Sequence, residues 1–126
     1  MFPTFGPDTG GSAFDPALLT TALGLEPQSV MSSGNGTGRD FNTGSGKCFA
    51  TQIVGSLTAG TIDGKIQEST DNSFWTDVAA GAFTQVSSAN NIQTIGFNRT
   101  KRYLRYAYTI GGGIDQLACV LFSANQ

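Results

Sequence analysis

The sequence predicts an all-β fold, an antiparallel β-sandwich that follows an extended N-terminal arm carrying one short helix. Three observations lead to this prediction. The chain has 126 residues, enough for one domain with a core of its own. Gly, Ser, Thr and Asn are abundant while Glu, Lys and Leu are scarce, which favours strands and turns over helices. From Cys48 onward, short apolar or alternating runs recur between turn residues at the spacing of a sandwich or barrel.

Residues 1–47 predict an arm and a linker. The first residues carry aromatic side chains on a backbone without a periodic pattern. Asp15, followed by Pro, then precedes an apolar run that stops at Gly24, and this order predicts one short helix. Residues 31–46 consist mainly of Gly, Ser, Asn and Thr, which is typical of a flexible linker or a long loop. The sandwich is therefore expected over residues 48–126.

Within the sandwich, the apolar runs predict strands near residues 48–57, 61–69, 74–78, 82–87, 92–97, 102–110 and 116–123. Turn residues support most of the joints: Asp71-Asn72, Asn90-Asn91 and Gly111-Gly112-Gly113. The pair Asp63-Gly64 is compatible with a turn or with a bulge inside a longer strand. In the strand over 102–110, alternation places four side chains in the core: Leu104, Tyr106, Tyr108 and Ile110.

The residue types present argue against catalysis. The chain has no histidine, which removes the commonest general base, the Ser-His and Cys-His pairs and the usual imidazole metal ligand. The run Gly44 to Lys47 has Phe41 and Cys48 where a phosphate-binding loop needs Gly and Ser or Thr. Four acidic residues match no calcium loop and are interpreted as turn or solvent-facing residues, although two of them could still form a carboxylate pair: Asp63, Glu68, Asp71 and Asp77. We expect no enzymatic activity, no catalytic residues, no cofactor and no metal site.

Charge and cysteine content limit the partners and the compartment. A net charge of −2 gives no global field to attract nucleic acid, and no apolar run approaches the roughly 20 residues that span a bilayer. We therefore expect neither nucleic acid nor membrane as a partner. No basic segment precedes an apolar stretch near Met1, so Cys48 and Cys119 are expected to be free, mostly buried thiols, with a single disulfide as the alternative.

Four of the seven basic residues fall within seven positions: Arg99, Lys101, Arg102 and Arg105. This cluster is compatible with charges that protect a strand edge from pairing, with a contact for an acidic protein surface, or with nucleic-acid binding. Phe74 and Trp75 are neighbours and would point to opposite faces of a strand. Trp75 is therefore expected either to be buried by a local bulge or to anchor an interface.

Between Lys65 and Arg105 the sequence resembles small tailed-bacteriophage head proteins. The similar residues are Lys65-Ile-Gln-Glu-Ser69, Asp71, Phe74-Trp75-Thr76-Asp77-Val78 and Lys101-Arg102-Tyr103-Leu104-Arg105. This resemblance implies a sandwich of jelly-roll type that coats or cements a capsid shell and contacts the major capsid protein. Residues 1–47 lie outside the similar region.

These observations lead to the expectation of a virion structural protein, a capsid cement or decoration protein on the capsid surface that is made in the host cytoplasm. Its expected partners are the major capsid protein and neighbouring copies of itself, so it is expected to form a homo-oligomer on the particle. The expected interface residues are Phe2, Phe5, Phe14, Leu18, Leu19, Trp75, Arg99, Lys101 and Arg102. The alternative is a tail-associated or cell-surface module that binds carbohydrate or a receptor, with Trp75 and Tyr103 as stacking residues.

Overall fold

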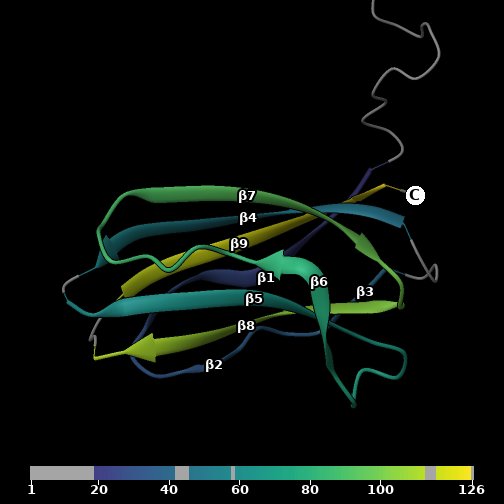
Figure 1. Cartoon of the computed structure of the whole chain (residues 1–126), viewed down its shortest axis with the longest axis horizontal. Helices are drawn as coiled ribbons and strands as arrows, with labels where there is room; N and C mark the ends of the chain where they lie inside the picture. Colours follow the sequence, from purple (N-terminus) through teal and green to yellow (C-terminus); the bar gives the residue numbers. More distant parts are fainter. Residues whose placement is uncertain (1–18, 42–45, 58, 113–115, 126) are drawn as a thin grey trace, which may run out of the picture.

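The computed structural model describes residues 19–41, 46–57, 59–112 and 116–125, which form strands joined by turns (Figure 1). The strands are β1 (Leu19–Val30), β2 (Gly34–Asn35), β3 (Arg39–Asp40), β4 (Gly46–Leu57), β5 (Thr61–Ser69), β6 (Thr76–Ala82), β7 (Asn91–Arg99), β8 (Tyr103–Gly111) and β9 (Gln116–Asn125). No helix is found among these described residues. The prediction of an all-β fold is therefore confirmed.

Two antiparallel sheets face each other. Sheet A has the strand order β1-β9-β4-β7, and sheet B has the order β2-β8-β5-β6 (Figure 1). The short strands β2 and β3 both pair with β8, so they occupy one edge position in two pieces. Counted this way, the sandwich has four positions in each sheet and the interleaved strand order of a jelly roll. The implied jelly-roll topology is thus present.

The core lies between the sheets and is built by side chains that alternate along the strands. In β4 the inward side chains are Cys48, Ala50, Gln52 and Val54, and each is fully buried. They face Ile62, Ile66, Leu104 and Tyr106 of sheet B, which are also fully buried. Each large aliphatic side chain contributes at most about 1.5–3 kcal/mol by leaving water. The Tyr106 hydroxyl donates a hydrogen bond to Gln52 Oε1, which satisfies both oxygen atoms inside the core.

The segment from residue 19 to residue 41 belongs to the sandwich, although the sequence suggested an arm and a linker there. Residues 1–18, including Asp15, lie outside the described residues. The remainder of the predicted helix, from Leu19 to Leu23, is extended in β1 and pairs with β9. Gly24 does not stop a helix: a Cβ there would lie 2.6 Å from the Phe122 ring. Helix propensity is a weak preference, and pairing with a distant strand overrides it.

Part of the expected linker is also ordered. Strands β2 and β3 pair with β8, and Phe41 is buried with its ring centroid 6.1 Å from that of Phe122. Residues 42–45 lie outside the described residues. The boundary expected at residue 47 therefore does not coincide with the start of the sheets.

Several expected strands and turns are confirmed. Strand β5 matches the range predicted, and Asp63-Gly64 lies within it in unbroken register with β8, so it is neither a turn nor a bulge in that pairing. Asn72 and Asn90 have φ angles of 61° and 59°, the left-handed conformation that Asn adopts in turns. The strand expected over 82–87 is reduced to an isolated bridge between Val86 and Ile62.

Candidate interaction surface

The outer face of sheet A is apolar. Its outward side chains alternate with the buried ones along β1, β4, β7 and β9. Five of the seven large hydrophobic residues that are exposed in the described chain lie here: Ile92 (68%), Phe49 (44%), Leu121 (39%), Ile53 (38%) and Leu23 (36%). The half-buried Cys119 pairs with Ile53 and completes the set. We call these six residues the apolar face.

The register brings these side chains into rows across the sheet. Ile53 lies between Ile92 and Cys119, and Leu121 pairs with Leu23. The polar groups between the rows are satisfied locally, because the Thr51 and Thr94 hydroxyls are hydrogen-bonded at 2.9 Å. Among the described outward residues of sheet A in this region, Lys47 is the charged one, and its Nζ lies 5.7 Å from the centroid of the Phe49 ring. The face therefore presents apolar area with little charge.

The outer face of sheet B is polar. It holds an open groove of 660 Å³ whose lining includes Asp63, Lys65, Gln67, Arg105 and Tyr108. The charged groups are bonded to one another. Lys65 Nζ lies 3.1 Å from Asp77 Oδ1, and Gln67 Nε2 donates to the same oxygen at 2.9 Å. Arg105 Nε donates to Gln67 Oε1 at 2.8 Å.

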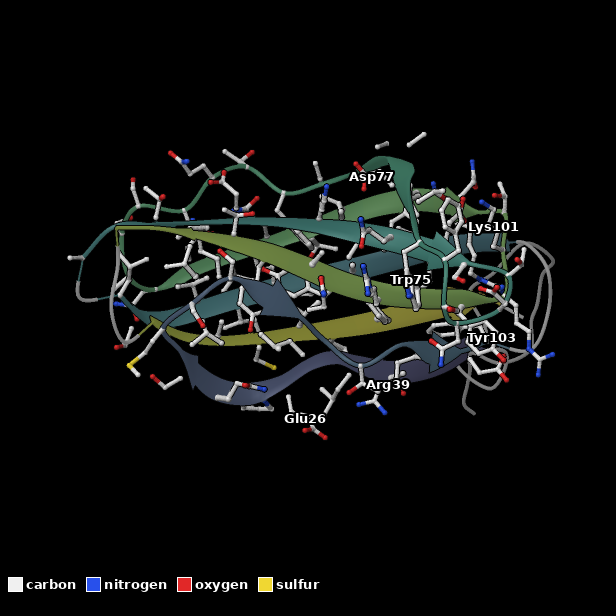
Figure 2. The ribbon with its side chains drawn as sticks, turned by 90° about the horizontal axis from the view of Figure 1, so that it is seen from below. Glu26, Arg39, Trp75, Asp77, Lys101 and Tyr103 are labelled. Atoms are coloured by element: carbon white, nitrogen blue, oxygen red, sulfur yellow. The ribbon has the colours of Figure 1, made fainter. Side chains whose placement is uncertain are left out.

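This network sets the ionisation of the Asp77 carboxyl, which is labelled in Figure 2. Hydrogen bonds from Gln67 and Lys65 hold the pKa of Asp77 below its ordinary value. Asp71 behaves similarly in the turn before β6. Its Oδ1 accepts hydrogen bonds from the Phe74 and Ser73 amides, and these lower the pKa of Asp71.

Trp75 is half-buried beside this network and lies in the turn before β6, so strand alternation does not apply to it. The Arg105 guanidinium lies 4.6 Å from the centroid of its ring, and a Cβ on Gly38 would come within 2.9 Å of it. Figure 2 shows Trp75 in the same half of the sandwich as Lys101 and Tyr103. Trp75 is therefore packed without the bulge considered above, and the adjacent Phe74 is 73% exposed.

The structure separates the three basic residues that were expected to form one surface. Arg99 is 1% exposed, its Nη1 donates to the Lys101 carbonyl at 3.0 Å, and its guanidinium lies 5.4 Å from the Phe41 ring centroid. Lys101 Nζ donates to Thr76 Oγ1 at 3.0 Å. Only Arg102 of the three is exposed, where both of its hydrogen bonds to the Asp40 carboxylate are 2.7 Å long and raise its pKa. Arg99 thus belongs to the interior and is not accessible to a partner.

One acidic residue also departs from its expected position. Glu68 is buried, and its two carboxylate oxygens accept hydrogen bonds from the Thr100 amide at 2.8 Å and the Thr100 hydroxyl at 2.7 Å. It closes the turn between β7 and β8 and does not face solvent. Asp63 is exposed and accepts a hydrogen bond from Gln85 at 2.9 Å.

The remaining expected interface residues are in the N-terminal segment. Phe2, Phe5, Phe14 and Leu18 lie outside the described residues. Leu19 is the first residue of β1 and pairs with Asn125 of β9 at the edge of sheet A.

The apolar face was missed by the interpretation of the sequence, although a signal for it was present. In β4, Phe49 and Ile53 alternate with Cys48, Ala50 and Val54, so both faces of the strand are apolar. A strand with only one buried face ordinarily alternates apolar with polar residues. The departure from alternation is the signal for a second contact surface.

Both cysteines of the chain lie among the described residues. Cys48 and Cys119 are free, and burial raises the pKa of both thiols. Within the described ranges, no group of three or more Cys, Asp or Glu side chains is arranged to hold a metal ion. The same ranges contain no helix with the length and apolar character needed to cross a membrane.

Comparisons with known proteins identify relatives by fold. No protein-family model and no curated protein matches the sequence. Among solved structures, the PBSX exported protein XepA superposes with a TM-score of 0.58 at 18% identity, over 84% of this chain and 37% of XepA. The SPBc2 prophage-derived protein YomS gives 0.55 at 12% identity, over 86% and 93%. VP2 in a subviral particle of infectious bursal disease virus gives 0.60 at 8% identity, over 90% and 36%.

The chain spans little more than a third of the length of XepA and VP2 and nearly the whole of YomS. At these identities the likeness concerns the fold. The protein shares its β-sandwich with a phage-derived protein, a PBSX protein and a viral particle protein.

Proposed function

We propose that this chain is a structural protein of a bacteriophage virion, located on the capsid surface, where it binds the shell as a cement or decoration protein. The observation that carries the proposal is the apolar face. A group of exposed apolar side chains on one sheet face is typical of a surface that contacts another protein. Its partners in the particle are the major capsid protein and neighbouring copies of the chain, and the role is non-enzymatic.

Three further observations support this role. The jelly roll is a fold that viral capsids use repeatedly, although the fold alone does not define a function. The structural neighbours include a prophage-derived protein and a protein from a subviral particle. The sequence from Lys65 to Arg105 resembles small phage head proteins.

The groove on sheet B is the best location for the alternative function, carbohydrate binding. Sugar sites need open aromatic faces beside polar groups. The Trp75 ring is engaged by Arg105, and the Tyr108 ring stacks on Tyr106 with centroids 5.5 Å apart. The polar groups of the groove are also bonded to one another. These contacts favour the structural role over sugar binding.

The test combines location with a matched pair of variants. Electron microscopy of purified particles should place the protein in many copies over the head. In co-sedimentation with particles that lack the protein, Ile53→Lys should weaken binding at least about 100-fold, because a charge is then buried in an apolar contact. Thr109→Lys puts the same side chain on the outer face of sheet B and should change binding by less than about threefold.

Absence of the protein from the head would overturn the proposal. Wild-type binding by Ile53→Lys would show that the apolar face is not the contact. Circular dichroism of both variants serves as the control for folding.

A further inference from the structure

We propose that the apolar face of one copy binds the N-terminal segment, residues 1–18, of a second copy. This inference rests on the proposed function, since a coat of many copies places such faces and segments side by side. It identifies the partner seated on the apolar face, whereas the proposed function requires only that a virion protein covers it. Four properties of the described residues and of the sequence support it.

The first property is the pattern of side-chain sizes on the apolar face. Large and small residues alternate across the sheet, because Phe49 pairs with Gly96 on one side and with Ser123 on the other. At Gly96 an added Cβ would lie 3.2 Å from the Phe49 ring, so the ring packs closely over the glycine and the two strands present a ring beside small residues. Exposed aromatic rings of this kind are enriched in protein interfaces, where they pack against rings and aliphatic side chains of the partner.

The second property is the content of the N-terminal segment. It carries three phenylalanines, Phe2, Phe5 and Phe14, together with Leu18. It also contains three prolines, which lack the amide proton that a strand added to a sheet edge must donate. A segment of this kind binds through its side chains on a face, and not through its backbone at an edge.

The third property is charge. The charged side chains of residues 1–18 are Asp8 and Asp15, and both are acidic. The described outward residues on the apolar part of sheet A include one charged group, the ammonium of Lys47 beside Phe49. The two surfaces therefore attract each other weakly, and no like charges oppose their contact.

The fourth property is reach. The segment is followed by Leu19, which pairs with Asn125 at the edge of sheet A. Eighteen residues span at most about 60 Å when extended, whereas a twelve-residue strand such as β4 is about 40 Å long. The segment is thus long enough to leave its own sandwich and to cross the apolar face of a neighbour.

Cys119 provides a native probe for this contact, because it lies on the apolar face while Cys48 is buried. In the full-length Phe5→Cys variant, mild oxidation of the concentrated protein should produce a disulfide-linked dimer that reducing agent separates. The dimer should disappear when Cys119→Ser is added. In the triple variant with Phe5→Cys, Cys119→Ser and Thr109→Cys, the second thiol lies on the outer face of sheet B. The disulfide-linked dimer should not form in this variant.

A second measurement is needed in case Phe5→Cys itself weakens the contact. In sedimentation equilibrium of the full-length protein, Phe49→Ser should weaken self-association about tenfold, as should Phe14→Ser. The double variant should be weaker by much less than 100-fold, because residues that share one contact do not act additively.

The possible outcomes separate the two proposals. Three results would overturn the inference. They are a disulfide within one chain between Cys119 and the thiol of the Phe5→Cys variant, equal cross-linking in the Thr109→Cys variant, or no cross-link together with unchanged self-association. Any of these results leaves the proposed function standing if Ile53→Lys still abolishes particle binding. Conversely, a dimer that forms in purified protein supports the inference even if the protein is absent from the capsid, a result that would overturn the proposed function.

Discussion

The two outer faces of the sandwich lie on the same core and differ in almost every other respect. On sheet A, the apolar face presents aliphatic and aromatic side chains with one neighbouring ammonium group, that of Lys47. On sheet B, Lys65, Asp77, Gln67 and Arg105 are linked in a continuous set of ionic and hydrogen-bonded contacts. The inner faces of both sheets carry the buried core, with partly buried side chains such as Ile95 and Ile110 packed at its margin.

This difference shows that the inward and outward side chains of a sandwich have different roles. Inward positions determine stability, and outward positions are free to meet different surroundings because successive side chains in a strand point to opposite faces. On the outer face of sheet B, charged and amide side chains bond to one another. The apolar face leaves large hydrophobic side chains exposed, as surfaces that contact a partner commonly do.

The strongest test of this division uses two strand glycines that face opposite ways. Gly64 faces the core, where an added Cβ would lie 2.3 Å from Gln52 Oε1, and we expect Gly64→Ala to cost about 3 kcal/mol of unfolding free energy. Gly96 faces outward, and its nearest neighbour is the exposed Phe49 ring, which can move aside. Gly96→Ala should therefore be neutral or stabilise by about 0.5 kcal/mol. Urea unfolding measures both, and equal losses would contradict the division between inner and outer positions.

A second test concerns the end of the sandwich, where Arg99 and Arg102 are close in sequence. Arg99→Met removes the buried hydrogen bond to the Lys101 carbonyl and should lower the unfolding free energy by about 2–3 kcal/mol. Arg102→Gln removes an exposed pair with Asp40 and should leave the urea midpoint unchanged within error. A larger loss for Arg102→Gln than for Arg99→Met would contradict the assignment of Arg99 to the interior and of Arg102 to an exposed pair.

The smallest expected effect is in acid and should arise from the polar face. The folded-state pKa of Asp77 is lowered, so its contribution to stability is present above the ordinary Asp pKa of about 4 and is lost as the pH falls through the lower, folded value. Between pH 6 and pH 2.5 the wild type should lose slightly more stability than Asp77→Asn, which lacks this titration. An identical pH profile for the two proteins, measured by urea midpoints, would show that the network does not stabilise sheet B.

The sequence predicted local features of the fold better than distant ones. Strand β5 and the Asn72 and Asn90 turns follow from nearby residues, and the structure confirms them. The direction of β1 depends on β9, almost the whole chain away, so a local apolar run ending in Gly24 suggested a helix instead.

The candidate site was predictable to a lesser extent. Burial of Arg99 depends on the ring of Phe41, which is distant in the sequence, and no local pattern reports such a contact. A charged residue is ordinarily exposed, so composition pointed to the surface. The apolar face was accessible to sequence reasoning through Phe49 and Ile53, because it required only that both faces of one strand be compared.

The position of β9 has a consequence for biosynthesis. It lies between β1 and β4 in sheet A, and its pairing joins residue 19 to residue 125. Sheet A therefore stays open until the last strand leaves the ribosome, and contacts this distant in sequence place folding on the order of milliseconds to seconds. A nascent chain that ends before Gln116 exposes both neighbouring strands of the missing one, so we expect chaperones to bind it at β1 and β4.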